Sequence, residues 1–177
     1  MLKDKYSDDY ISTILEETNV IAMIGASANK NRPSYFAMKY LLGKGYMVYP
    51  VNPGAAGQNI LGQKVYADLD DVPAPIDMVD IFRNSEAALK ITRNAISLKE
   101  TLKIKTIWMQ LGVYNDDAAQ EAQAAGLKVV MNRCPKIEYG RLSGEIAWAG
   151  VNSGVISSVR PKLAAEKVQS FVLKSRK

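Results

Sequence analysis

Short apolar runs alternate with longer segments of helical spacing along most of this chain. The apolar runs cover residues 19–25, 47–51, 78–82, 106–111 and 128–131. Continuous runs of this length, bounded by turn residues, are typical of strands buried on both faces of a parallel sheet. The helical segments predict helices at 7–18, 33–42, 85–101 and 116–125, and we expect the first to pack on the sheet edge.

Strands and helices that alternate at roughly 25-residue intervals indicate an α/β fold. We expect a Rossmann-like, doubly wound parallel sheet of about five strands with helices on both faces. The pattern fits less well at 55–66, which predicts a loop with a short extended piece at residues 64–66, and beyond 136, where only a terminal helix at 161–173 stands out. We expect residues 1–150 to form the ligand-binding domain and residues 151–177 to form a basic, helical extension of it.

The first apolar run leads into the turn with the clearest functional signature. Gly25, Ala26 and Ser27 end the run, a polar loop follows, and Pro33 opens the next helix. Unpaired backbone N–H groups and the positive end of the helix dipole converge in such a turn, which suits a phosphate group. Ligands of doubly wound sheets bind beyond the carboxyl ends of the strands, so we expect the binding cleft there.

Composition excludes several classes of site. The chain has no histidine and one cysteine, Cys134, which removes histidine-based catalytic triads, histidine zinc sites and thiolate zinc clusters. A single cysteine forms no intramolecular disulfide and fits a reducing compartment. No run approaches the roughly 18 apolar residues of a membrane span, and the polar N-terminus is no signal peptide. We therefore expect a cytoplasmic protein that binds neither a metal nor a membrane.

The formal charge of +5 lies at the C-terminus. Residues 151–177 carry six basic residues and one acidic residue, and the rest of the chain is neutral. Binding to nucleic acid would rest on this tail alone, so we favour a solvated basic helix end and expect no nucleic-acid partner.

The sequence departs from the dinucleotide-binding pattern in two places. Gly25 is not followed by the second and third glycines of G-x-G-x-x-G. The second predicted strand ends in Asn52 and Pro53, where NAD-binding proteins place an acidic residue for the ribose. These departures favour a nucleotide that is held in another way.

Several short motifs together resemble one known family. They are Gly25-Ala26-Ser27, Asn31-Arg32-Pro33-Ser34, Val51-Asn52-Pro53-Gly54, Ile60-Leu61-Gly62, Phe82-Arg83, Gln110-Leu111-Gly112 and Asn132-Arg133-Cys134-Pro135. In this order they resemble the small stand-alone CoA-binding proteins of bacteria and archaea. That domain is similar to the N-terminal CoA-binding domain of the succinyl-CoA synthetase α subunit. The resemblance covers about residues 15–142.

The resemblance implies a role for each part of the cleft. It places the CoA pyrophosphate over Gly25, Ala26 and Ser27, beside the helix start formed by Arg32, Pro33 and Ser34. It places the adenosine near Val51, Asn52 and Pro53, and the pantetheine arm near Phe82, Arg83 and Gln110. Ala55 stands where the synthetases carry a lysine for the 3′-phosphate. The phosphorylated histidine of the synthetases is also missing, which excludes succinyl-CoA synthesis by this chain.

We therefore expect non-catalytic binding of coenzyme A or a short acyl-CoA. The alternatives are an NAD(P)-dependent oxidoreductase, a CoA-binding component of a multi-chain acyl-CoA enzyme, and an interaction protein that uses its basic tail. Exposed edges of an open sheet are compatible with a homodimer or a partner enzyme. We interpret Cys134 and Trp108 as buried residues, although a helix beginning at Pro135 would lower the pKa of the thiol. We interpret Asp77 and Asp80 as ordinary polar residues at strand ends.

Overall fold

The computed structural model describes residues 6–144, 151–152 and 155–156. Its α-helices are α1 (Asp8–Glu17), α2 (Pro33–Gly43), α3 (Ser85–Ser97), α4 (Lys99–Leu102), α5 (Asp116–Ala124) and α6 (Pro135–Leu142). The strands of the main sheet are β1 (Val20–Ile24), β2 (Met47–Val51), β5 (Met78–Ile81), β6 (Thr106–Met109) and β7 (Lys128–Val130). Short elements complete the chain: β3 (Asn59–Ile60), β4 (Gln63–Lys64), η1 (Pro53–Ala55), η2 (Leu69–Asp71), β8 (Val151–Asn152) and β9 (Val155–Ile156).

The main sheet is parallel throughout and has the strand order β2-β1-β5-β6-β7. Every residue of β5 and β6 is buried, as expected for central strands covered on both faces. The predicted doubly wound α/β fold of about five strands is confirmed.

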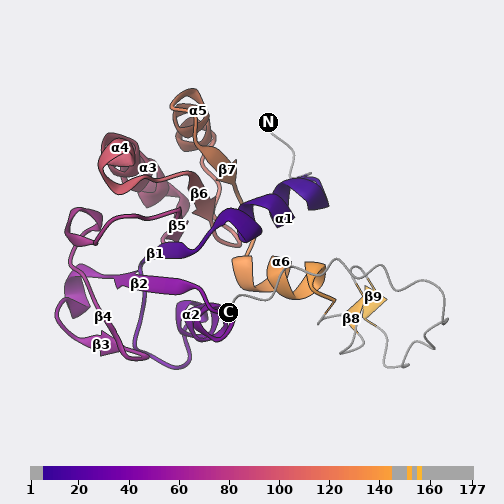
Figure 1. Ribbon diagram of the computed structural model, residues 1–177, viewed down its shortest axis with the longest axis horizontal. Helices are drawn as coiled ribbons and strands as arrows, with labels where there is room; N and C mark the ends of the chain where they lie inside the picture. The colour runs from indigo at the N-terminus through magenta and orange to yellow at the C-terminus, as the bar shows by residue number, and fades with distance from the viewer. Residues whose placement is uncertain (1–5, 145–150, 153–154, 157–177) are drawn as a thin grey trace.

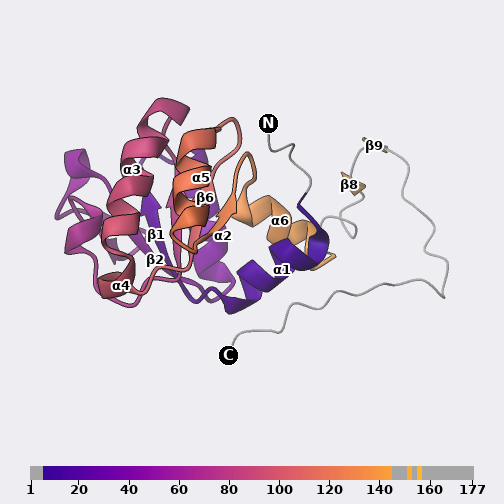
Figure 2. The ribbon, with the colours of Figure 1, turned by 90° about the horizontal axis from the view of Figure 1, so that it is seen from above.

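Helices cover both faces of the sheet (Figures 1 and 2). One hydrophobic core contains buried residues of α3, α4 and α5, and the other contains buried residues of α1, α2 and α6. Side chains two residues apart on a strand share a face. Met78, Phe82 and Trp108 belong to the second core or pack against it. Asp80 and Gln110 are therefore on the α2–α6 side.

The expected packing of the first helix on the sheet edge is observed at β7. The Tyr10 hydroxyl accepts from the Val129 N–H at 3.1 Å and lies 3.3 Å from the Val129 carbonyl oxygen, to which it donates. The Tyr6 hydroxyl accepts from the Met131 N–H at 2.9 Å, and the Tyr6 and Tyr10 rings are stacked. These tyrosines occupy backbone groups that an open edge strand would otherwise expose.

Three local expectations need correction. The predicted loop at 55–66 contains the antiparallel hairpin β3–β4, which the sequence did not predict, whereas the extended piece expected at residues 64–66 is observed where Tyr66 bridges to Val51. The helix predicted at 85–101 is divided at Leu98, where the Ser97 hydroxyl donates to the Asn94 carbonyl at 2.7 Å and competes with the helical ladder. The weak pattern beyond 136 conceals the helix α6.

The terminal helix predicted at 161–173 lies outside the described residues, as does most of the basic segment 151–177. Within the described parts of the chain, none of the helices is both long and apolar enough to span a membrane.

Candidate functional site

The carboxyl ends of the five parallel strands meet at one edge of the sheet. The chain runs from β1 through α2 to β2 on one side, and later returns to β5 on the other side of β1. This reversal places the topological switch point between β1 and β5, where doubly wound sheets bind their ligands. The predicted turn at residues 25–27 and the Phe82–Arg83 segment follow these two strands directly.

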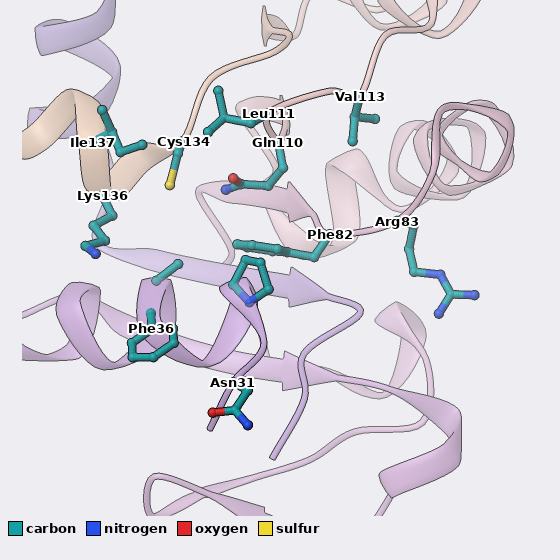
Figure 3. Close-up of a pocket in the computed structure, with 12 residues that line it drawn as sticks. Asn31, Phe36, Phe82, Arg83, Gln110, Leu111, Val113, Cys134, Lys136 and Ile137 are labelled. Atoms are coloured by element: carbon teal, nitrogen blue, oxygen red, sulfur yellow. The ribbon is translucent and has the colours of Figure 1, made fainter. Parts of the chain in front are cut away.

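A cavity of about 550 Å³ opens beside this switch point. It lies between the start of α2, the ends of β5 and β6, and the start of α6 (Figure 3). Its walls are formed by Asn31, Pro33, Phe36, Ala37, Phe82, Arg83, Gln110, Leu111, Val113, Cys134, Lys136 and Ile137. The surface of these walls is mainly apolar, with a few polar groups among them. A cavity of this size and character is typical of a small-molecule site.

Four of the predicted ligand-binding residues line the cavity: Pro33, Phe82, Arg83 and Gln110. The Phe82 ring lies at the centre of the close-up, and the Arg83 guanidinium points away from the middle of the cavity (Figure 3). Gln110 is buried, and its Nε2 donates to both carboxylate oxygens of Asp80, at 2.9 and 3.2 Å. The structure thus brings together the residues expected around the pantetheine arm.

The first turn is held by contacts with its neighbours. Gly25 has a φ of +90°, and its N–H donates to the Val51 carbonyl at 2.9 Å, so this amide is already in use. Ala26 is completely buried, and its carbonyl accepts from Asn52. Ser27 is partly exposed, and its N–H donates no hydrogen bond within the described residues. Of the three, Ser27 is the best placed to meet a phosphate, and the ligand contacts of the turn stay a prediction.

The polar loop before α2 is ordered by its own side chains. The Ser27 hydroxyl accepts from the Asn29 N–H at 3.2 Å, and the Asn29 side chain accepts from the Asn31 N–H at 2.9 Å. Arg32 is the N-cap of α2 and is exposed, whereas Ser34 is buried in the first turn of that helix. Arg32 can therefore reach an anion in front of the helix, and Ser34 is directed into the protein.

The end of β2 supports the turn from the other side. The Asn52 Nδ2 donates to the Ala26 carbonyl at 2.8 Å, and its Oδ1 accepts from the Gly54 N–H at 3.0 Å. Val51 is buried, and Pro53 is exposed at the start of η1. Asn52 thus joins the ends of β1 and β2, and only one of its amide hydrogens is left for a ligand. The adenosine contacts proposed for Val51, Asn52 and Pro53 stay predictions.

Sequence reasoning did not predict several of the residues that line the cavity. Phe36 lies within the predicted helix 33–42, whose apolar spacing gives no sign of a cavity, yet its exposed fraction is 51% and it lines the cavity. Lys136 and Ile137 come from α6, whose pattern the sequence did not reveal, and Ile137 is 43% exposed. Pro135 was the available signal, since proline favours the first turn of a helix.

The interpretation of Asp80 as a strand-end residue is wrong. Asp80 lies inside β5 and is fully buried, and burial raises the pKa of its carboxyl group to about 7, although the Gln110 amide opposes this shift. Asp77 does lie just before β5, where its carboxylate accepts from the N–H groups of Asn19 and Val20 and pairs with Lys105.

Cys134 is buried, as expected, and its sulfur lies at the cavity (Figure 3). Burial raises the pKa of the thiol, and the nearby Asp80 adds to this effect, whereas amide N–H groups at the start of α6 oppose it. The start of α6 thus lowers the pKa of the thiol, as expected, but burial outweighs this contribution and the net shift is upward. Trp108 is buried, as expected, and donates to the Arg133 carbonyl at 2.7 Å.

Comparison with known proteins adds independent findings. The family described as "CoA binding domain" matches residues 19–140. The uncharacterized protein YneT of Bacillus subtilis is 30% identical over 129 residues, which cover 73% of this chain and 91% of YneT. The solved structure of a hypothetical protein from Pyrococcus horikoshii superposes with a TM-score of 0.72, covering 78% of this chain and 94% of that one. The two sequences are 37% identical. A structure from Thermus thermophilus is 29% identical, with a TM-score of 0.71 over 77% of this chain and 98% of that one.

Proposed function

The chain belongs to the family of CoA-binding domains, and we propose that it binds coenzyme A or a short acyl-CoA, without catalysis of its own, in the cleft at the carboxyl ends of the sheet. The observation that carries this proposal is the mainly apolar cavity at the switch point, lined by Phe82, Arg83 and Gln110. The pantetheine arm is long, narrow and mostly apolar with a few amide groups, and the cavity offers apolar walls with few polar groups.

The opposite end of the ligand meets the first turn. The Ser27 N–H and hydroxyl can donate to the pyrophosphate, and Arg32 at the start of α2 adds a positive charge. Arg83 connects the two regions, because its Cδ would lie 2.9 Å from a β-carbon at Gly25 and its side chain lines the cavity. One extended ligand can therefore contact the turn and the cavity together.

Two features of the cavity support binding without catalysis. The raised pKa of Cys134 keeps the thiol protonated near neutral pH, which makes it a weak nucleophile. The Asp80 carboxyl is enclosed by the protein and bonded to Gln110, so it does not reach the cavity directly.

The apolar rim extends the proposal to acyl-CoA. Phe36 and Ile137 line the cavity and leave about half of their surface exposed, and Leu111, which also lines it, is 56% exposed. A short acyl group on the CoA sulfur would cover part of this surface and gain from its burial.

Titration calorimetry of the purified protein tests the proposal, with CoA, dephospho-CoA, acetyl-CoA and NAD⁺ as separate ligands. We expect CoA to bind at micromolar strength and NAD⁺ to give no heat. A weaker signal with dephospho-CoA would show that the 3′-phosphate is recognised despite Ala55. Binding of NAD⁺ in place of CoA would overturn the proposal and favour an oxidoreductase.

A variant pair tests the location of the ligand. Ser27→Glu places a bulky carboxylate where the pyrophosphate is expected, and should weaken CoA binding at least tenfold through steric and charge repulsion. Ser12→Glu on α1 adds the same group at a distance from the cleft and should leave CoA binding unchanged. Equal CoA affinities for the two folded variants would place the ligand elsewhere.

A further inference from the structure

Asp80 is a carboxyl group that the fold encloses completely. It lies between Met23 and Trp108 in the sheet, and its exposed fraction is zero. Within the described residues it forms no ion pair, and its hydrogen bonds come from Gln110 alone. Burial of a carboxylate without a cation is costly, so a residue of this type in a central strand calls for a physical explanation.

The hydrogen bonds of Asp80 fix the orientation of the Gln110 amide. An ionised carboxylate only accepts, and Gln110 points its NH₂ group at both oxygens, at 2.9 and 3.2 Å. The Gln110 carbonyl oxygen, Oε1, is thereby turned away from Asp80. Figure 3 shows the end of this side chain directed into the cavity, toward the side where Cys134 lies.

This oxygen is available to a ligand. Gln110 is only 6% exposed, and its Oε1 accepts no hydrogen bond within the part of the chain that the structure describes. Oε1 is also not among the enclosed side-chain atoms that lack a partner in the described residues, so it keeps access to the cavity. A ligand N–H or S–H group that enters the cavity can therefore donate to it.

We propose that Asp80 is a positioning residue that holds the Gln110 carbonyl oxygen toward the cavity, where it accepts a hydrogen bond from the pantetheine arm of CoA. This inference rests on the proposed function. The donor is either an amide N–H of the arm or the terminal thiol, and both present the same chemistry to Oε1. A thioester has no S–H, so the two donors can be told apart with acetyl-CoA.

The arrangement makes ligand binding depend on pH. The pKa of Asp80 is about 7, so the carboxyl group gains a proton as the pH falls below that value. A protonated Asp80 donates to Gln110, the amide turns over, and its NH₂ group faces the donor of the ligand. The other charged or titratable groups on the cavity walls are Arg83, Lys136 and Cys134, and the raised pKa of Cys134 places its titration above this range.

The test is calorimetry of the full chain with dephospho-CoA between pH 6 and pH 8.5. This ligand is used because the 3′-phosphate of CoA has an ionisation of its own near pH 6. For the wild type we expect about a tenfold loss of affinity from pH 8 to pH 6, the size of one buried hydrogen bond. Asp80→Asn should bind more weakly at pH 8 and lose this pH dependence, because an uncharged amide no longer fixes Gln110.

Asp77→Asn is the matched control, since it removes a buried carboxylate from the other end of β5. Its affinity for dephospho-CoA should follow the wild-type pH profile. Gln110→Met, which removes the acceptor and keeps the length of the side chain, should bind as weakly at pH 8 as the wild type does at pH 6. If this loss affects CoA and not acetyl-CoA, the thiol is the donor; an equal loss for both identifies an amide.

A second measurement does not depend on variants. If the ligand prefers ionised Asp80, binding must lower the pKa of Asp80, which carboxyl carbon NMR can follow in the wild type. An unchanged pKa, or a wild-type pH profile in Asp80→Asn, would overturn the role of Asp80 and leave CoA binding in place. If neither CoA nor dephospho-CoA binds the wild type at any pH, the proposed function and this inference both fail.

Discussion

Gly25 and Phe82 approach so closely that the end of β1 has no room for a side chain. A β-carbon at Gly25 would lie 2.5 Å from the Phe82 carbonyl oxygen and 2.9 Å from the Arg83 Cδ. The φ of +90° at Gly25 also disfavours any L-residue. The turn proposed for the pyrophosphate and the wall proposed for pantetheine are therefore built against each other.

Gly25→Ala should destabilise the protein by roughly 3 kcal/mol or more, because it combines backbone strain with a steric clash. Gly57→Ala is the matched control, since Gly57 has a φ of +79° and nothing within 4 Å of an added β-carbon. Gly57→Ala should lower the free energy of unfolding by about 1–2 kcal/mol, because it introduces backbone strain without a steric clash. Urea denaturation measures both values, and equal losses would show that the contact with Phe82 relaxes at little cost.

Asn52→Ala should weaken CoA binding about tenfold, because the Ala26 carbonyl loses its donor and the turn is no longer tied to β2. Asn115 offers a matched control, as its Oδ1 accepts from the Ala118 N–H and its Nδ2 donates to the Ser85 carbonyl. Both alanine variants should lose about 1–3 kcal/mol of stability in urea denaturation. Calorimetry should show lower CoA affinity for Asn52→Ala alone. If Asn115→Ala weakens binding equally, the effect reflects general destabilisation.

The main sheet could be predicted because central parallel strands leave continuous apolar runs. The segment Met78–Ile81 still indicates a central strand although it contains Asp80, because three of its four residues are apolar. The hairpin β3–β4 has two residues in each strand, too few for any periodicity to show. In α6, Gly140 and the buried Glu138 interrupt the apolar spacing. Pro135 is therefore the sequence feature that indicates the start of this helix.

The residues of the candidate site that directly follow strands could be predicted from the sequence, whereas those that lie on helices were harder to predict. Phe82 and Gln110 could be placed at strand ends, and both line the cavity. The position of Phe36 at the cavity could not be predicted, because the sequence pattern of an apolar helix residue is the same whether its side chain packs in the core or lines a cavity. The Asp80–Gln110 pair needed the register of β5 and β6, which the sequence does not give.

Tyr10→Phe should destabilise the protein by about 1–3 kcal/mol, because the N–H and carbonyl of Val129 lose their partner at the edge of β7. The variant should also self-associate more readily at high concentration, since the edge strand is uncovered. Denaturation and light scattering measure the two effects. Tyr66→Phe is the control, because the Tyr66 hydroxyl forms no hydrogen bond among the described residues, and it should change neither property. Identical behaviour of the two variants would assign Tyr10 a packing role only.

Asp77 and Asp80 lie three residues apart and should contribute to stability with opposite dependence on pH. Burial opposes ionisation of Asp77, but its bonds to Lys105, Asn19 and Val20 outweigh this and lower its pKa. Its contribution is therefore present above the unfolded pKa of about 3.9 and is lost as the pH falls through the lower folded value. The pKa of Asp80 is raised to about 7, so ionising it costs stability as the pH rises from about 4 to about 7.

Asp80→Asn removes that cost and should stabilise the protein at pH 8, by up to about 4 kcal/mol, with the gain shrinking toward zero near pH 4. Asp77→Asn should destabilise the protein at pH 8, and this loss should disappear at low pH. Urea denaturation of the wild type and both variants from pH 4 to pH 8 gives the two differences directly. A constant difference for Asp80→Asn across this range would mean that Asp80 keeps an ordinary pKa, with the enclosed carboxylate stabilised by groups other than Gln110.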